Sequence, residues 1–215
     1  MTVNKVKCFI LGGGPSLRGL DFSTIQDHYT LGINKAFLYY PVSACFAMDY
    51  KFYRWLHTSP EYNKDGAVLA EHWQRFSGEK YLILNSEEQL VDHADDPSYH
   101  LIKRLEQPAL SYSLTDGIYT GNNSGVGGLT LAIALGFREI YLLGYDMKVD
   151  HDNHQSHWHD GYPPPMGFNE VDHYVKTFSD SFAELAKLIH QAGIKVINLN
   201  PDSALPYFPK AATWA

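Results

Sequence analysis

Short apolar runs that lead into a polar residue or a glycine most constrain the fold of this chain. Six such runs are spread along its 215 residues: Val6–Leu11, Tyr29–Asn34, Ala44–Asp49, Tyr81–Asn85, Glu139–Gly144 and Lys195–Asn200. Runs that are apolar throughout are typical of parallel strands buried on both faces of a sheet. Helical patterns lie between them, and this alternation predicts a Rossmann-like, doubly wound α/β fold with a mainly parallel sheet.

Two helices are clear in the sequence. Asn123 or Ser124 can cap a helix that stops at Gly136. A longer amphipathic helix, with apolar residues at helical spacing, is expected from about Asn169 to Gly193. The glycines mark the expected helix ends.

The chain length fits one domain that spans residues 1–215. Residues 50–119 mix aromatic and charged side chains with few clear strands, and we interpret them as a partly helical insertion or a lid on the acceptor side. Residues 148–168 are polar and rich in histidine and proline. We predict a long loop there, over the edge of the sheet that binds ligands.

Composition excludes some classes of protein. The formal net charge of −7 argues against a general nucleic-acid binder, because such binding depends on neutralising phosphates. No apolar stretch approaches the roughly 20 residues that span a bilayer, so we predict a cytoplasmic protein without an integral membrane segment. Cys8 and Cys45 lie in apolar runs and are expected to be reduced core thiols.

The polar ends of the predicted strands should converge on one edge of the sheet, where ligands of such folds bind. These residues are Gly12, Asn34, Asp49, Asp146 and Asn200. An acidic residue such as Asp49 or Asp146 can hold a ribose hydroxyl, a Mg²⁺ ion or an amine there. It can equally cap the following helix.

The first strand leads into the glycine-rich turn Gly12-Gly13-Gly14-Pro15-Ser16. The turn is not a dinucleotide fingerprint, because Leu17 occupies the third glycine position of G-x-G-x-x-G. Glycines let the backbone approach a ligand and leave N–H groups free to meet phosphate. The alternative is an ordinary tight turn.

A second glycine-rich turn, Thr120–Gly128, leads into the predicted helix after Asn123. Each glycine inside a helix costs about 0.5–1 kcal/mol relative to alanine. That cost indicates a close approach, either of a neighbouring strand or of a ligand. A ligand anion would also be attracted by the helix N-terminus.

Histidines cluster in the segment from Asp150 to Asp160. His157 and His159 flank Trp158, so they share one face of an extended segment. Histidine acts as a general base or as a metal ligand near neutral pH. The spacing matches no established zinc pattern. A catalytic or substrate-contacting role, a divalent-metal site and a solvated loop all stay open.

Three segments resemble one known family. Ile10–Ser23, then Ser124–Val126 with Leu131–Asp146, and last Asn200–Leu205 are similar to the small bacterial sialyltransferases that use a CMP-sugar donor. The same scaffold is shared by flagellin glycosyltransferases, archaeal-type 6-hydroxymethylpterin diphosphokinases and uncharacterised phage and bacterial proteins.

The resemblance implies a binding site for a nucleotide-sugar donor, of the CMP type. With the strand-end residues, the candidate site comprises Gly12, Gly13, Gly14, Ser16, Asn34, Asp49, Asn123, Ser124, Gly125, Asp146 and Ser203. His157, His159 and His173 compete for the position of the family's general base, and we favour His157 or His159. Four positions depart from the family: Gly13 and Asp49 replace asparagines, Gly121 an arginine and Lys148 a tyrosine. The residues that bind the donor nucleotide in the family are therefore better kept in this chain than the residues that carry out the transfer.

The leading hypothesis is therefore a glycosyltransferase that moves a sugar from a nucleotide donor to a hydroxyl acceptor. One alternative is a Mg²⁺-dependent pyrophosphoryl transferase that uses Asp49 and Asp146. Another is a nucleotide or sugar binder without catalytic activity.

Overall fold

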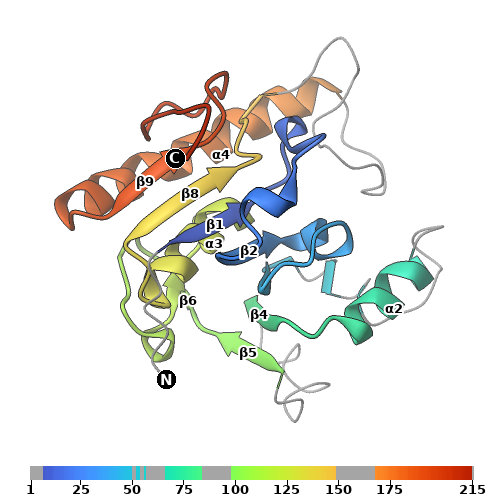
Figure 1. The fold of residues 1–215 in the computed structure, drawn as a ribbon. Coiled ribbons are helices and arrows are strands. Elements are labelled where there is room, and N and C mark those ends of the chain that lie inside the picture. The colour runs from blue at the N-terminus through green and yellow to red at the C-terminus, as the bar shows by residue number, and fades with distance from the viewer. Residues whose placement is uncertain are drawn as a thin grey trace.

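The computed structural model describes residues 7–49, 52–53, 56, 66–83, 98–148 and 168–214. Its centre is a sheet of seven parallel strands in the order β5-β4-β3-β2-β1-β8-β9 (Figure 1). The strands are β1 (Cys8–Leu11), β2 (Tyr29–Ile33), β3 (Ala44–Ala47), β4 (Glu79–Ile83), β5 (Tyr99–Ile102), β8 (Glu139–Leu143) and β9 (Lys195–Asn198). The sheet confirms the predicted α/β fold with its parallel strands.

Side chains alternate between two cores on the two faces of the sheet. Cys8 and Ile10 of β1 lie in the core that also holds residues of helices α3 (Ser124–Ala134) and α4 (Phe168–Gln191). Phe9 and Leu11 lie in the other core, with helix α2 (Gly66–Arg75) and the short 3₁₀ helices η1 (Pro15–Leu17), η2 (Phe22–Thr24) and η3 (Asn34–Leu38). We call these the α3/α4 face and the α2 face.

The strand order reverses between β1 and β8. From β1 the chain continues into η1, whose Leu17 packs on the α2 face. From β8 it continues to α4, whose Phe182 packs on the opposite face. The β1/β8 boundary is therefore the topological switch point, where folds of this kind bind ligands beyond the carboxyl ends of the strands.

Residues 50–119 contribute to the central sheet, although they were predicted as an insertion or lid. They supply β4 and β5 at one edge of the sheet, and the described part also contains α2. Two further short strands, β6 (Arg104–Leu105) and β7 (Ile118–Tyr119), pair in parallel, and the 3₁₀ helix η5 (Leu114–Asp116) lies between them in the chain. The role of this segment as a lid stays a prediction.

The C-terminal segment wraps around edge strand β9. The Asn198 amide donates to the Pro209 carbonyl (2.8 Å), and the Ala211 amide donates to the Asn198 carbonyl (3.0 Å). These bonds cover an edge that would otherwise present unpaired backbone groups. The segment then reaches the α2 face, where the Trp214 ring lies 5.5 Å from the ring of Phe9.

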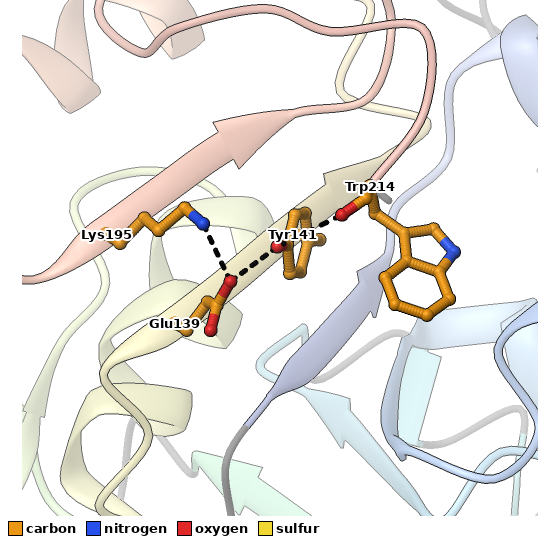
Figure 2. Close-up of polar contacts among 4 residues, drawn as sticks. All are labelled: Glu139, Tyr141, Lys195 and Trp214. Carbon is orange, nitrogen blue, oxygen red and sulfur yellow. Dashed lines mark hydrogen bonds and ion pairs between the residues drawn. The ribbon is translucent and has the colours of Figure 1, made fainter.

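Figure 2 shows the polar contacts beside Trp214. The Tyr141 hydroxyl donates to Glu139 Oε1 (2.6 Å), with the Trp214 carbonyl a longer acceptor at 3.4 Å, and Lys195 Nζ donates to the same Glu139 oxygen (2.8 Å). The hydrogen bonds from Lys195 and Tyr141 lower the pKa of Glu139. This network lies at the amino ends of β8 and β9, away from the predicted site.

Candidate functional site

The parallel strands bring the predicted strand-end residues to one edge of the sheet, which we call the carboxyl edge. Gly12, Asn34 and Asp146 follow β1, β2 and β8. Asp49 follows β3 and is exposed. The N-terminus of α3 lies near the same edge, because Gly125 approaches the ring of Tyr145, two residues beyond β8.

The amides of the first glycine turn are mostly bonded to the protein itself. Gly12 N donates to the Leu143 carbonyl and Gly14 N to the Gly144 carbonyl, both at 2.8 Å. The expectation that these N–H groups are free is therefore wrong at Gly12 and Gly14. Among the N–H groups from Gly12 to Ser16, only that of Gly13 makes no hydrogen bond to the described chain.

Asp146 fastens the first turn to the end of β8. The carboxylate is buried, with 2% of the residue exposed. Its Oδ2 accepts from the Ser16 amide (2.9 Å), and its Oδ1 accepts from the Asn200 side-chain amide. A Cβ on Gly14 would lie 2.0 Å from Oδ2, so only glycine leaves room for this carboxylate. We call this group of Ser16, Asp146, Asn200 and Gly14 the carboxylate clamp.

The ring of Tyr145 joins the two glycine turns. A Cβ on Gly12 would lie 3.1 Å from the Cδ2 and Cε2 atoms of the ring, and one on Gly125 would lie 3.0 Å from Cε1. The Tyr145 hydroxyl donates to the Gly125 carbonyl (3.0 Å). Burial raises the pKa of this hydroxyl, so it stays protonated as a donor. Both turns therefore lie within contact of one buried aromatic side chain.

In the second turn the helix begins as the sequence predicts. Asn123 is the N-cap, and its Oδ1 accepts from the Val126 amide (2.8 Å). Its Nδ2 donates to the Phe178 carbonyl of α4 (3.2 Å). The amides of Ser124 and Gly125 make no hydrogen bond within the described chain, as expected for the first residues of a helix. No acidic residue occupies the first turn.

The glycines farther along α3 serve packing against the sheet. A Cβ on Gly127 would lie 2.6 Å from the ring of Phe46 in β3, and one on Gly128 would lie 2.4 Å from Ile33 Cδ1 in β2. Of the two alternatives that the sequence left open, the close approach is to neighbouring strands at these two positions. At the start of the helix, the amides of Ser124 and Gly125 stay available for a ligand.

Asn34 has an unusual conformation for a residue with a side chain. Its φ is 51°, in the left-handed region, and its Oδ1 is buried without a hydrogen-bond partner. The second non-glycine residue with positive φ in the described chain is Met147, which follows Asp146 (φ 48°). Both lie just beyond the carboxyl ends of strands, so backbone strain gathers at this edge.

The remaining predicted residues differ in what the structure describes. Ser203 is buried, and its hydroxyl donates to the Tyr145 carbonyl (2.6 Å) and accepts from Asn198 Nδ2 (2.9 Å) and the Leu205 amide (3.0 Å). It holds the C-terminal turn against β8. His157 and His159 lie outside the described residues. No group of three or more histidine, cysteine or acidic side chains placed to hold a metal occurs in the described ranges.

A surface cavity of about 450 Å³ opens beside the first turn at the β1/β8 switch point. Its walls include Ser16, Leu17, Leu143, Gly144, Leu199 and Trp214. The volume falls within the range of roughly 300–1,000 Å³ that is common for small-molecule sites. Mainly apolar walls with a few polar groups suit a planar organic group better than a phosphate.

Comparison with known proteins adds no family to this geometry. Neither the protein-family models nor the curated protein sequences gave a match. Across the described part of the chain, no helix combines the length and apolar character needed to cross a bilayer.

Sequence reasoning missed two residues that organise the site. Tyr145 follows the predicted strand run Glu139–Gly144, and nothing in the sequence marks its contact with Gly12 and Gly125. Arg104 lies in a segment without a clear pattern, yet its Nη2 donates to the Gly121 carbonyl (2.9 Å) beside the second turn. Both contacts join residues distant in the chain, so local patterns could not reveal them.

Proposed function

We propose that this protein binds a nucleotide-activated sugar at the carboxyl edge of the sheet and transfers the sugar to a hydroxyl acceptor. The observation that carries the proposal is Asn34, with its left-handed backbone and its buried, unpartnered Oδ1. A buried acceptor without a partner costs about 1–3 kcal/mol, and a left-handed asparagine adds strain. Such costs gather at functional sites, where a ligand removes them.

The chemistry of the edge fits a nucleotide. Asn34 Oδ1 needs an N–H or O–H donor, which an exocyclic amine of a base or a ribose hydroxyl supplies. The unbonded amides of Gly13, Ser124 and Gly125 are donors, which suit phosphate oxygens. One acceptor for a nucleoside group and several donors for an anion are what a nucleotide requires.

The resemblance to the CMP-sugar-dependent sialyltransferases supports the choice of glycosyl transfer. In this mechanism a histidine of the predicted loop, His157 or His159, removes the proton from the acceptor hydroxyl. The amides at the start of α3 stabilise the departing phosphate. The clamp also favours transfer without metal, because both carboxylate oxygens of Asp146 already accept hydrogen bonds from the protein. A Mg²⁺-dependent pyrophosphoryl transferase would have to rely on Asp49.

The test is thermal unfolding with CMP, UDP, GDP and ATP, each in large excess and with or without Mg²⁺. We expect one nucleotide to raise the melting temperature without metal, since a ligand that binds only the folded state stabilises it. The absence of any shift contradicts nucleotide binding. A shift that needs both ATP and Mg²⁺ favours pyrophosphoryl transfer instead.

The variant Asn34→Gly tests whether the unpartnered Oδ1 of Asn34 contacts the nucleotide. Glycine adopts positive φ without strain and removes the unpartnered oxygen, so the unliganded protein should be no less stable. Affinity for the nucleotide should fall about tenfold, which corresponds to one lost hydrogen bond of about 1.4 kcal/mol. The control is Asp27→Gly, at an exposed position before the amino end of β2 and away from the carboxyl edge. Equal affinities for the two variants would contradict a contact with Asn34.

A further inference from the structure

Arg104 lies beside the second glycine turn, on a strand that the proposed function does not use. Strand β6 pairs in parallel with β7, so that Arg104 lies opposite Ile118. Arg104 Nη2 donates to the carbonyl of Gly121 at 2.9 Å. Gly121 lies three residues before the first residue of α3. The guanidinium is thus fixed next to the helix N-terminus.

The charge of Arg104 has no counter-charge in the described chain. Its Nε is buried without a hydrogen-bond partner, and no described carboxylate lies within ion-pair distance. Arg75 differs, because its guanidinium pairs with Glu71 at 2.6 Å on an exposed helix surface. A partly buried cation with an unsatisfied N–H is unfavourable unless an anion joins it.

The start of α3 is electrostatically positive in the same region. A helix N-terminus carries about half a positive charge, which acidic residues often offset. Here the cap is the neutral Asn123, and the first turn holds no acidic residue. The Ser124 and Gly125 amides make no hydrogen bond within the described ranges. The Arg104 guanidinium, which has no counter-charge in the described chain, and the unbonded amides of Ser124 and Gly125 would therefore both be satisfied by an anion.

We propose that Arg104 binds the phosphate or diphosphate group of the ligand, together with the first amides of α3. The inference rests on the proposed function and names the cation that holds the anionic part of the same ligand. A guanidinium is suited to this task, because its planar N–H groups match two phosphate oxygens at once. In a protein with a formal net charge of −7, a local cation is needed to attract an anionic ligand.

The experiment measures by calorimetry the binding of three probes: CMP, cytidine and inorganic pyrophosphate. If the thermal-unfolding test selects a nucleotide with another base, that nucleotide and its nucleoside replace CMP and cytidine. The variants are Arg104→Met and Arg104→Lys. For Arg104→Met we expect the affinity for the nucleotide and for pyrophosphate to fall about ten- to a hundredfold, as for a lost charged hydrogen bond. Affinity for the nucleoside should stay unchanged. Arg104→Lys keeps the charge but not the planar fork, so its loss should be intermediate.

Arg138→Met is the matched control. Its Nη1 also donates to backbone carbonyls, those of Ile133 and Phe137, but at the opposite end of α3. It should bind all three probes as the wild type does.

The outcomes separate the two proposals. If Arg104→Met and Arg104→Lys keep wild-type affinity for the nucleotide, the role of Arg104 is overturned and the proposed function stands. If the wild type binds pyrophosphate through Arg104 but no nucleotide, the anion site stands and the proposed function fails. If Arg104→Met does not fold, Arg104→Lys decides, and a wild type that binds no phosphate compound overturns both.

Discussion

The two glycine-rich turns look alike in the sequence, but they use their glycines in different ways. In the first turn the Gly12 amide donates to the carbonyl of Leu143 in β8, and the Gly14 amide donates to the carbonyl of Gly144, just after that strand. Gly14 also makes room for the Asp146 carboxylate. In the second turn Gly127 makes room for the ring of Phe46, while the amides at the helix start stay unbonded. The first turn is mainly a clamp between strands, and the second combines packing with an anion-binding end.

This difference shows that a glycine-rich turn after a strand is ambiguous evidence for a phosphate site. Glycine permits a close approach, but the group that approaches can belong to the protein. What decides is the destination of the backbone N–H groups, since each buried one needs a partner. By this criterion a single amide of the first turn, that of Gly13, remains for a ligand. The second turn offers the amides of Ser124 and Gly125 at the helix start and lies beside Arg104.

The largest expected effect comes from Gly14→Ala. The added Cβ would lie 2.0 Å from Asp146 Oδ2 and 2.7 Å from the Gly144 carbonyl oxygen, and neither group can move without breaking a buried hydrogen bond. We expect the free energy of unfolding to fall by about 3 kcal/mol, measured by urea denaturation. Gly19→Ala is the control, because it is strained at φ 75° but meets no atom within 4 Å. It should cost about 1–2 kcal/mol. If Gly14→Ala and Gly19→Ala lower the free energy of unfolding equally, Gly14 is not needed to make room for the Asp146 carboxylate.

Asp146→Asn should have the next largest effect. Both carboxylate oxygens accept hydrogen bonds, one from Ser16 N and one from Asn200 Nδ2. In the asparagine variant an NH₂ group replaces one of these oxygens, so two N–H donors point at each other and one hydrogen bond is lost. We expect a loss of about 2 kcal/mol in the free energy of unfolding. The preference for nucleotide over nucleoside should not change, because the clamp is structural.

Asp202→Asn serves as the control for this substitution, since Asp202 is exposed and close by in the chain. It should leave stability unchanged. A loss of the nucleotide preference in Asp146→Asn, at unchanged stability, would instead make Asp146 a ligand-binding residue.

The strands buried on both faces could be predicted from the sequence, because their apolar runs leave little choice of environment. The start of α3 could be predicted to within one residue, since Asn123 and Ser124 both precede a strongly apolar helix; the structure makes Asn123 the cap. Strand β5 was missed because Tyr99, His100 and Leu101 are only partly buried at the edge of the sheet. Strands β6 and β7 have two residues each, too few for any pattern to show.

The location of the candidate site could be predicted from the sequence, but the contacts between its residues could not. The polar strand ends had to converge, since parallel strands share one carboxyl edge. The atoms that fill the space beside the glycines come from far along the chain: Asp146 bonds to Ser16 across 130 positions. Arg104 is likewise brought to Gly121 by the β6–β7 pairing. Such partners depend on the tertiary fold, which residue types and spacing do not specify.

The smallest effect is expected for Gly127→Ala, which probes packing in the second turn. Its Cβ would meet the Phe46 ring at 2.6 Å, but alanine also favours the helix by about 1 kcal/mol. We expect a net loss of about 1 kcal/mol in the free energy of unfolding. In a Phe46→Leu background the ring is gone, so the same substitution should be neutral or stabilising, with a coupling measured by a double-mutant cycle. Nucleotide affinity should be retained in both backgrounds. If the cost of Gly127→Ala is the same with and without the ring, the contact with Phe46 does not explain this glycine. If affinity is lost while stability is kept, Gly127 serves the ligand and not the packing of the helix on the sheet.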